Sequence, residues 1–554
     1  MRTLNPPVGA GRSILALMVH VVIVLGLLAG YLGIEARGLN GTDTLDAVSS
    51  VLLLLSLWLL VSWIMSEGTL LNPYGLFLSA SLPFHSGYSV LRFLDQESLM
   101  WLTGRVTEGA LADTLTFVVG GYAMLHLGAL LVSAVASREP NFERPLYDGT
   151  RIYQVGWLLL AIATVPLMIK MRASIETVLS GGYISLFEGG GREESRSGFE
   201  GLISLFSDFF LPGVMFLLAG SRNRPIGKVV AILGLLIYSG SYLFLGFRAF
   251  SLIPIAVFVW VWHRTIRQLP ILPVALVGGG LFLIVAPLVR QFRDLSGSDR
   301  MSLEALWEAY AGADNPVLAL IAELAGSVLT ITFTTELVPE MRPFEMGYGY
   351  LRALANAIPI LDFPDVYGYA GTWLAYSITP SLAVGGFGFG FSFMGEAYLN
   401  FGWIGGILML GVIGAAVAGL HRWADRSGDL ARFAFIASFL PVLIFYTRGE
   451  SISISRPILW YAMIPYVLVL VLRSMDRRIG AEIPGIKPPA SAPPRMEDRL
   501  PESVGPHQDN RSAWPIETFG TAYGTEQPGA AQPLPPQPAP RASDNSWQDG
   551  RDHG

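Results

Sequence analysis

Four arginines stand at the ends of long apolar runs, where a permanent positive charge is costly unless it has a partner or a purpose. Arg248 lies between two such runs in "GFRAFSLIPIAVFVW", Arg290 and Arg293 follow a third run, and Arg448 follows a fourth. The planar guanidinium group holds phosphate oxygens through paired, charge-assisted hydrogen bonds. Gathered at one edge of a membrane, these side chains would hold an anionic, lipid-like ligand.

Each arginine also has a simpler explanation. A lone arginine beside an apolar run commonly extends its head group to the interface, or pairs with a nearby carboxylate such as Asp294 or Glu450. Arg248, Arg290 and Arg448, however, all fall on the side of the predicted topology where the positive-inside tendency disfavours them. This coincidence favours a shared binding site over three separate interfacial contacts.

Two carboxylates have the chemistry of a general base, which accepts a proton from a reacting hydroxyl. Glu396 is preceded by five glycines in "GGFGFGFSFMGEAYLNFGWIGG" (385–406), and Tyr398 and Asn400 follow it as further polar groups. Glycine lets the backbone approach a ligand closely. A favourable charge at a helix N-terminus is the simpler reading of Glu396. Glu450, in "YTRGESISISRP", is the second candidate.

The composition identifies the class of protein. Of the 554 residues, 52% are hydrophobic and only 14% are charged, and the mean hydropathy is +0.49. A soluble protein carries about 25% charged residues, so we predict an integral membrane protein with many spans. The absence of cysteine excludes disulfides, thiolate metal sites and a cysteine nucleophile. A net charge of −6 gives no indication of nucleic-acid binding.

Apolar segments of about 20 residues, long enough to cross a bilayer as helices, recur along the chain. They predict an all-α fold with about twelve transmembrane helices, near 13–34, 46–66, 69–91, 113–136, 152–171, 200–220, 228–246, 249–263, 270–289, 396–420, 430–447 and 456–473.

Basic loops set the orientation of these helices. The loops 137–151, 221–228, 263–268, 421–432 and 473–478 are all rich in arginine or lysine and fall on alternate ends of the twelve spans. Because short basic loops stay in the cytoplasm, we expect this side and both termini to be cytoplasmic.

The opposite face then carries two large loops, 172–199 and 290–395. Within the second loop, 301–312 and 315–338 read as amphipathic helices on the membrane surface, and 315–338 could instead be a thirteenth span. These loops belong to a transmembrane domain, 1–478. The remaining segment, 479–554, is rich in proline, glycine and small polar residues. This composition predicts a disordered cytoplasmic tail.

Four short motifs, in this order, resemble the Wzy-type polymerases, which polymerise O-antigen and exopolysaccharide repeat units. They are "SGGYISLF" in the first large loop, "GFRAF" at the turn between the seventh and eighth spans, "GFGFSFMGEAYLNFGWIGG" at the end of the second large loop, and "TRGE" before the last span. The resemblance extends over roughly 150–473. It implies a GT-C-like glycosyltransferase of the bacterial inner membrane, with its large loops in the periplasm.

The resemblance also implies a reaction. The growing glycan on undecaprenyl pyrophosphate would be transferred to the non-reducing sugar of an incoming lipid-linked repeat unit. Arg248, Arg290, Arg293 and Arg448 would hold the diphosphate, with Tyr398 and Asn400 as further substrate-binding residues. Glu396, or in second place Glu450, would be the general base. No metal or cofactor is expected, and a chain-length regulator and a flippase are the expected protein partners.

Two other functions remain open at this stage. The related O-antigen ligases rely on a histidine in the large external loop, and 290–395 contains none. A transporter or flippase of lipid-linked sugars would be built from inverted repeats, and no internal repeat is visible. Both observations favour the polymerase.

Overall fold

The predicted all-α class is confirmed. The structure is a computed structural model that describes residues 10–37, 41–135, 149–187, 198–295, 302–312, 315–358, 367–386 and 388–482. Helices are the only regular elements within these ranges. The predicted tail lies, from residue 483 onward, outside the described residues.

The helices of the first half are α1 (Ala10–Arg37), α2 (Gly41–Glu67), α3 (Pro73–Phe93), α4 (Glu108–Val135), α5 (Thr150–Gly181), α6 (Phe199–Ser207), α7 (Phe210–Ala219), α8 (Pro225–Leu245), α9 (Arg248–Thr265) and α10 (Ile271–Gly280). Those of the second half are α11 (Ala286–Asp294), α12 (Leu303–Ala311), α13 (Pro316–Leu337), α14 (Tyr348–Asn356), α15 (Ala370–Ile378), α16 (Pro380–Val384), α17 (Phe393–Ser427), α18 (Leu430–Phe445), α19 (Ile452–Arg456) and α20 (Ile464–Glu482).

Eleven helices within the described residues are long and apolar enough to cross a membrane. Ten of them coincide with predicted spans, and the two other predicted spans, 69–91 and 249–263, form α3 and α9. Some helices are longer than predicted: α5 continues to Gly181, into the segment predicted as the first large loop. Arg290 and Arg293 likewise lie in the last turns of α11, so a helix fixes their directions.

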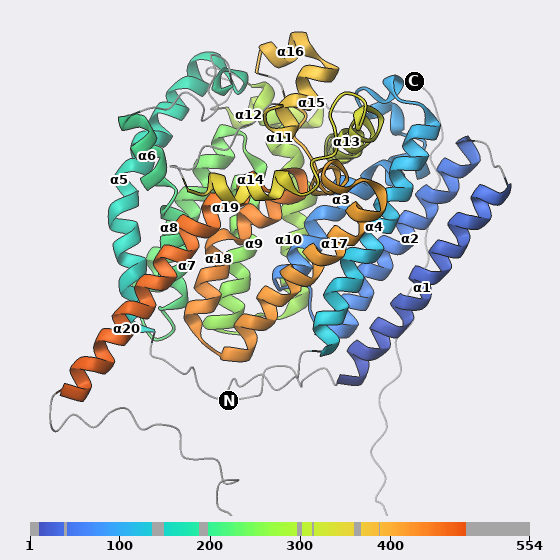
Figure 1. The fold of residues 1–554 in the computed structure, drawn as a ribbon. Coiled ribbons are helices and arrows are strands. Elements are labelled where there is room, and N and C mark those ends of the chain that lie inside the picture. Colours follow the sequence, from blue (N-terminus) through green and yellow to red (C-terminus); the bar gives the residue numbers. More distant parts are fainter. Residues whose placement is uncertain are drawn as a thin grey trace, which may run out of the picture. The chain divides into compact units, whose positions relative to one another are not determined.

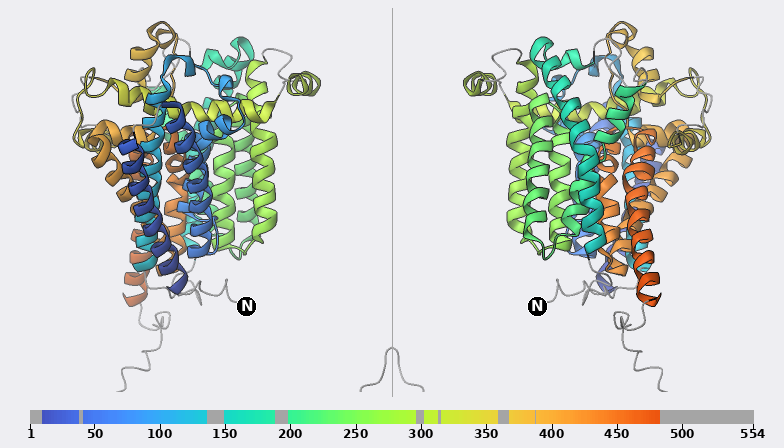
Figure 2. Two further views of the ribbon diagram at one scale, coloured as in Figure 1. Left: turned by 90° about the vertical axis from the view of Figure 1, so that its right-hand side faces the viewer. Right: turned by 90° about the vertical axis from the view of Figure 1, so that its left-hand side faces the viewer.

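The eleventh apolar helix, α13, lies within the segment predicted as the second large loop. Figure 2 shows it running obliquely across the upper part of the long helices rather than parallel to them. It packs mainly on α3, with further contacts to α4, α11 and α17, and most of its length is buried. Protein surrounds most of it, so apolar residues occupy most of its sides, whereas we expected an amphipathic helix with one polar face or a thirteenth span.

The most extensive contact between two helices of the described residues is that of α4 with α17, which lie beside each other in Figure 1. Glycines make this approach possible. A Cβ added at Gly414 would overlap the carbonyl oxygen of Leu125, and one added at Gly128 would overlap that of Gly411. The two backbones therefore meet directly, as small residues allow between membrane helices.

The predicted basic loops do gather at one end of the helices, the lower end in Figure 1. Ion pairs join them: Arg151 with Asp476, Arg264 with Asp425, and Arg473 with Asp429 through two contacts of 2.9 and 3.0 Å. We call this the basic end, made by 149–151, 221–228, 263–268, 421–432 and 473–476. Residues 137–148 lie outside the described residues.

The glycine contact predicts the effect of a larger side chain. We expect Gly414→Leu to lower the thermal stability of the purified protein in detergent, because overpacking of this kind costs about 1–3 kcal/mol or more. Gly26→Leu is the matched control, since a Cβ at Gly26 in α1 meets no atom within 4 Å. Equal melting temperatures for the two variants would contradict the close contact of α4 with α17.

Candidate functional site

Three of the predicted arginines surround one carboxylate, Glu323 of α13. Arg248 pairs with Glu323 Oε1, Arg293 Nη1 lies 3.0 Å from the same oxygen, and Arg290 Nε lies 3.9 Å from Oε2. The Arg248 side chain is 10% exposed and that of Arg290 is 38% exposed. Arg248 therefore forms the inner part of the group, and Arg290 its open edge.

A tight turn at Gly246 places Arg248 beside Glu323. Gly246 ends α8 in the left-handed conformation, with φ of 91°, which glycine adopts without steric cost. The chain turns at once, and α9 begins at Arg248. The carbonyl of Gly246 accepts a hydrogen bond of 2.9 Å from Arg293 Nε, so the "GFRAF" turn and α11 hold each other in place.

Arg448 reaches the same group from the turn after α18. Its electrostatic interactions are with Glu323, Arg293 and Tyr183, and its guanidinium lies 6.0 Å from the ring centre of Phe84. Three guanidinium groups lie within 4 Å of the Glu323 carboxylate, and a fourth, that of Arg448, interacts with it electrostatically, so the five charges together sum to +3. We call Arg248, Arg290, Arg293, Arg448 and Glu323 the arginine cluster.

The first and second motifs meet at this cluster. The Tyr183 ring of "SGGYISLF" lies 4.7 Å from the Arg293 guanidinium and 5.5 Å from the Phe247 ring of "GFRAF". A Cβ at Gly386, in the glycine-rich motif, would lie 2.6 Å from the carbonyl oxygen of Phe187. Gly386 has φ of +87°, so both the turn and the close approach require glycine there.

The glycine-rich third motif also contacts the fourth motif, "TRGE". A Cβ at Gly390 would lie 3.5 Å from Arg448 Nε, and one at Gly371 would lie 3.1 Å from the Gly390 oxygen and 3.5 Å from Glu450 Oε1. The four motifs, which are separated by up to 270 residues in the chain, are therefore one connected site.

Glu450 lies at the N-terminus of α15, where its two oxygens accept hydrogen bonds of 2.9 Å from Ala370 N and 3.2 Å from Gly371 N. Burial raises the pKa of this carboxyl group, while the two N–H groups and the nearby Arg352 and Arg342 oppose that increase. A carboxylate with a raised pKa and spare lone pairs has the properties of a general base.

Arg342 is a second cation near Glu450, on which it acts electrostatically. Its side chain is 1% exposed and pairs with Glu345. The guanidinium lies 5.2 Å from the Tyr367 ring centre and 5.1 Å from that of Trp373. Its Nε and Nη1 atoms are buried without a hydrogen-bond partner, so this cation has donor capacity to spare.

Glu396 is buried, and its contacts are with the neighbouring loop. The carboxylate accepts hydrogen bonds from Ser451 N at 2.9 Å, from Ser451 Oγ at 2.6 Å and from Tyr446 Oη at 2.8 Å. Glu396 lies in the first turn of α17, and the N-cap of this helix, Ser392, forms a hydrogen bond of 2.8 Å with His85 Nε2. Glu396 thereby fixes the loop that carries Arg448 and Glu450.

Tyr398 and Asn400 lie behind Glu396, toward the protein core. Tyr398 contacts the rings of Phe117, Trp403 and Phe344. Asn400 is fully buried, donates to the Glu396 carbonyl at 2.9 Å and accepts from Gly349 N at 3.2 Å. These contacts are within the protein rather than with the arginine cluster, so the predicted substrate contacts of both residues stay a prediction.

α17 is interrupted at Gly402, and the conformation of this glycine explains the break. Gly402 has φ of 66° and ψ of −159°, a conformation that is open essentially only to glycine. The helix breaks there, and the freed carbonyls of Leu399 and Asn400 accept hydrogen bonds from Glu345 N at 3.0 Å and Met346 N at 2.8 Å. The break therefore ties the helix of Glu396 to the segment of Arg342.

Sequence reasoning missed Glu323 and Arg342. One signal for Glu323 was available: it is a lone carboxylate in the apolar stretch "ALIAELAG", and a charge in such a stretch marks a site by default. Nothing comparable marks Arg342, which stands in an ordinary polar segment. Among the described residues, no group of three or more His, Asp and Glu side chains is placed to hold a metal ion.

A comparison with protein families finds one match that covers most of the chain. The family model described as O-antigen polysaccharide polymerase Wzy matches residues 16–476, which include all four motifs and the whole arginine cluster. No curated protein and no solved structure matches the chain.

The central position of Glu323 can be tested without any substrate. Glu323→Gln keeps the shape of the side chain but removes its charge, so the four guanidinium groups repel one another without compensation. We expect this variant to melt at a lower temperature than the wild type and to be stabilised more strongly by added inorganic pyrophosphate. Thermal melting of the purified protein during a pyrophosphate titration measures both effects.

Glu304→Gln, on the exposed face of α12, is the control for the loss of one carboxylate. If pyrophosphate stabilised Glu323→Gln no more than Glu304→Gln, the cluster would not be an anion site.

Proposed function

Because the chain belongs to the Wzy family of O-antigen polysaccharide polymerases, we propose that it transfers the growing glycan from undecaprenyl pyrophosphate to the non-reducing end of an incoming lipid-linked repeat unit. Family membership supports repeat-unit polymerisation by a multi-pass membrane protein. The carrier lipid, its diphosphate and the roles of individual residues are the parts that we propose.

The observation that carries the proposal is the arginine cluster with its net charge of +3. Opposite charges 4 Å apart interact with about 4 kcal/mol at an effective dielectric constant near 20, so a diphosphate gains far more here than a neutral sugar. The open edge at Arg290 gives a ligand access, and Glu323 keeps the arginines in place while the site is empty.

The reaction breaks one glycosidic bond and forms another. The bond between the anomeric carbon of the growing glycan and the diphosphate oxygen breaks, and the acceptor hydroxyl oxygen bonds to that carbon. The acceptor proton goes to a carboxylate, and the diphosphate leaves on its lipid with an increased negative charge. Fixed guanidinium groups stabilise this charge as it develops, which is the way preorganised electrostatics lowers a barrier.

The contacts favour Glu450 over Glu396 as the proton acceptor. The hydrogen bonds from Ser451 and Tyr446 use both oxygens of Glu396 more than once, whereas each Glu450 oxygen accepts a single backbone N–H. A carboxylate has about four lone-pair positions, so Glu450 keeps room for a proton. It also lies two residues from Arg448, next to the leaving group.

We place the acceptor sugar on the Arg342 side of Glu450. The base would then lie between the donor diphosphate at the arginine cluster and the acceptor near Arg342, Tyr367 and Trp373. Aromatic faces suit the apolar faces of sugar rings, and the unpaired Arg342 nitrogens suit hydroxyl or carboxylate oxygens.

The location follows from the charge of the two ends. The basic end would be cytoplasmic, with both termini on that side, and the arginine cluster would face the periplasm of a bacterial inner membrane. A flippase that delivers the lipid-linked units and a chain-length regulator are the proposed partners.

Removal of single arginines tests the diphosphate site. We expect Arg248→Ala, Arg290→Ala and Arg448→Ala each to reduce polymer formation by about 10²–10³-fold, the effect of losing one preorganised donor. Arg248→Lys should keep part of the activity, because an ammonium group cannot reproduce the bidentate contact. The assay is chain elongation from a defined lipid-linked repeat unit by the reconstituted, full-length protein.

Arg172→Ala, at an exposed position of α5, is the matched control and should polymerise as the wild type does. Normal polymer from all three cluster variants would exclude the proposed diphosphate site. Translocation of the lipid-linked unit without elongation would instead identify a flippase, and transfer to lipid A without elongation a ligase.

Glu450→Gln tests the base. We expect a loss of about 10²–10⁴-fold in elongation with unchanged binding of the donor lipid. Because burial raises the Glu450 pKa, Glu450 becomes protonated at a higher pH than an ordinary glutamate. The wild-type activity should therefore fall, on acidification, at a higher pH than that of an ordinary carboxyl group.

Glu396→Gln is the comparison for this prediction, since it retains the size of the side chain but weakens the contacts to the loop 446–451. It should lower the thermal stability more than Glu450→Gln does, because Glu396 accepts four hydrogen bonds and Glu450 accepts two. Full activity of Glu450→Gln, or a pH profile that the substitution does not alter, would show that Glu450 is not the base.

A further inference from the structure

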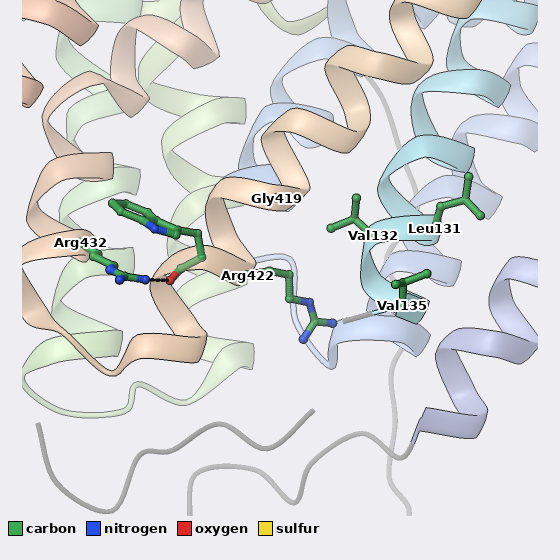
Figure 3. A pocket seen from close by; sticks show the side chains of 7 residues that line it. Leu131, Val132, Val135, Gly419, Arg422 and Arg432 are labelled. Atoms are coloured by element: carbon green, nitrogen blue, oxygen red, sulfur yellow. Dashed lines mark hydrogen bonds between the residues drawn. The ribbon is translucent and has the colours of Figure 1, made fainter. Parts of the chain in front are cut away.

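A cavity of about 470 Å³ opens at the basic end, remote from the arginine cluster. Figure 3 shows Leu131, Val132 and Val135 of α4 on one wall, with Gly419 and Arg422 of α17 opposite them. Its volume is within the range of about 300–1,000 Å³ that is typical of small-molecule sites. Nothing in the proposed reaction uses this cavity.

The cavity exists because the glycine contact between α4 and α17 ends before the helices do. At Gly414 an added Cβ would overlap the opposite backbone, yet at Gly419 it would meet no atom within 4 Å. Near Gly419 the apolar side chains of α4 are no longer covered by α17: Val135 is 82% exposed and Leu131 is 46% exposed. In a membrane, an apolar chain is needed to fill this space.

The rim of the cavity carries positive charge. Arg432 of α18 donates to the carbonyl of Trp423 at 2.9 Å, and its guanidinium lies 4.5 Å from the Trp423 ring centre. Within the described part of the chain it has no carboxylate at ion-pair distance, in contrast to Arg422, which pairs with Glu67. Arg422 Nε is in addition buried without a hydrogen-bond partner.

We propose that this cavity binds one anionic phospholipid from the leaflet at the basic end. An acyl chain lies against Leu131, Val132 and Val135, and the phosphate group pairs with Arg432. Apolar walls beside a cation match a lipid that has a long hydrocarbon chain and a negative head group. A free phosphate ion would leave the apolar walls uncovered. This site does not depend on the proposed polymerase reaction.

The test compares phosphatidylglycerol with phosphatidylcholine of identical acyl chains. The full-length protein is reconstituted with an equimolar mixture and released into detergent, and the retained lipid is identified by native mass spectrometry. We expect the wild type to retain one phosphatidylglycerol at least about fivefold more often than one phosphatidylcholine. Equal retention of the two lipids would overturn the proposal.

Two variants separate the two halves of the site. Gly419→Leu fills the cavity at a position where the added side chain meets open space, and it should abolish retention of both lipids. Arg432→Gln should retain lipid but lose the preference for phosphatidylglycerol. Arg222→Gln, an exposed arginine at the same end, is the control and should behave as the wild type does.

A preference that survives Arg432→Gln, or retention that survives Gly419→Leu, would contradict the assignment of this cavity. Inorganic phosphate is the further competitor: if it displaced phosphatidylglycerol from the wild type, the site would be one for a soluble anion and the proposal would fail. A thermal melt of each variant establishes that the fold is intact, and the wild-type comparison of the two lipids holds regardless of the variants.

Discussion

The arrangement of the upper end depends on one carboxylate that balances several cations. Arg248, Arg293 and Arg290 approach Glu323 from two different helices, and without it their mutual repulsion would separate α9 from α11. Removing one partner of a largely buried ion pair costs about 3–5 kcal/mol, which is a large fraction of the stability of most proteins. The balance is incomplete, since four guanidinium groups and one carboxylate leave a net charge of +3, and this is the charge that the proposed diphosphate would neutralise.

The same constraint explains why α13 crosses the upper part of the helices. A helix that crossed the bilayer would carry Glu323 at an apolar depth, where the charge has no water to solvate it. α13 runs obliquely over α3, and its Glu323 pairs with Arg290 and Arg293 of α11 and with Arg248, the first residue of α9. Its apolar residues remain buried against other helices, so a sequence that looks like a span serves as the support of a polar site.

Hydropathy and loop charge predicted most of the fold, because both are properties of short segments. They placed Arg248, Arg290 and Arg448 at one end, where the structure brings them together. The partner of these arginines could not be predicted, since Glu323 reaches them only through the packing of α13, a tertiary contact across 30 to 125 residues of sequence. Likewise, the neighbours of Glu396 could not be read from its place after a glycine run: only the fold shows that Ser451 and Tyr446 occupy its oxygens.

The two carboxylates of the motifs have different surroundings, and the proposed roles follow from them. Glu396 stands in the interior, and its hydrogen bonds to Ser451 and Tyr446 hold the loop in a single conformation. Glu450 stands on that loop, two residues after Arg448, and accepts only two hydrogen bonds, from Ala370 N and Gly371 N. A base must lie within hydrogen-bond reach of the acceptor hydroxyl, and a mobile loop would not keep it there. The buried Glu396 therefore fixes the position of Glu450, so the glycine-rich motif and "TRGE" act as one unit although 40 residues of sequence separate them.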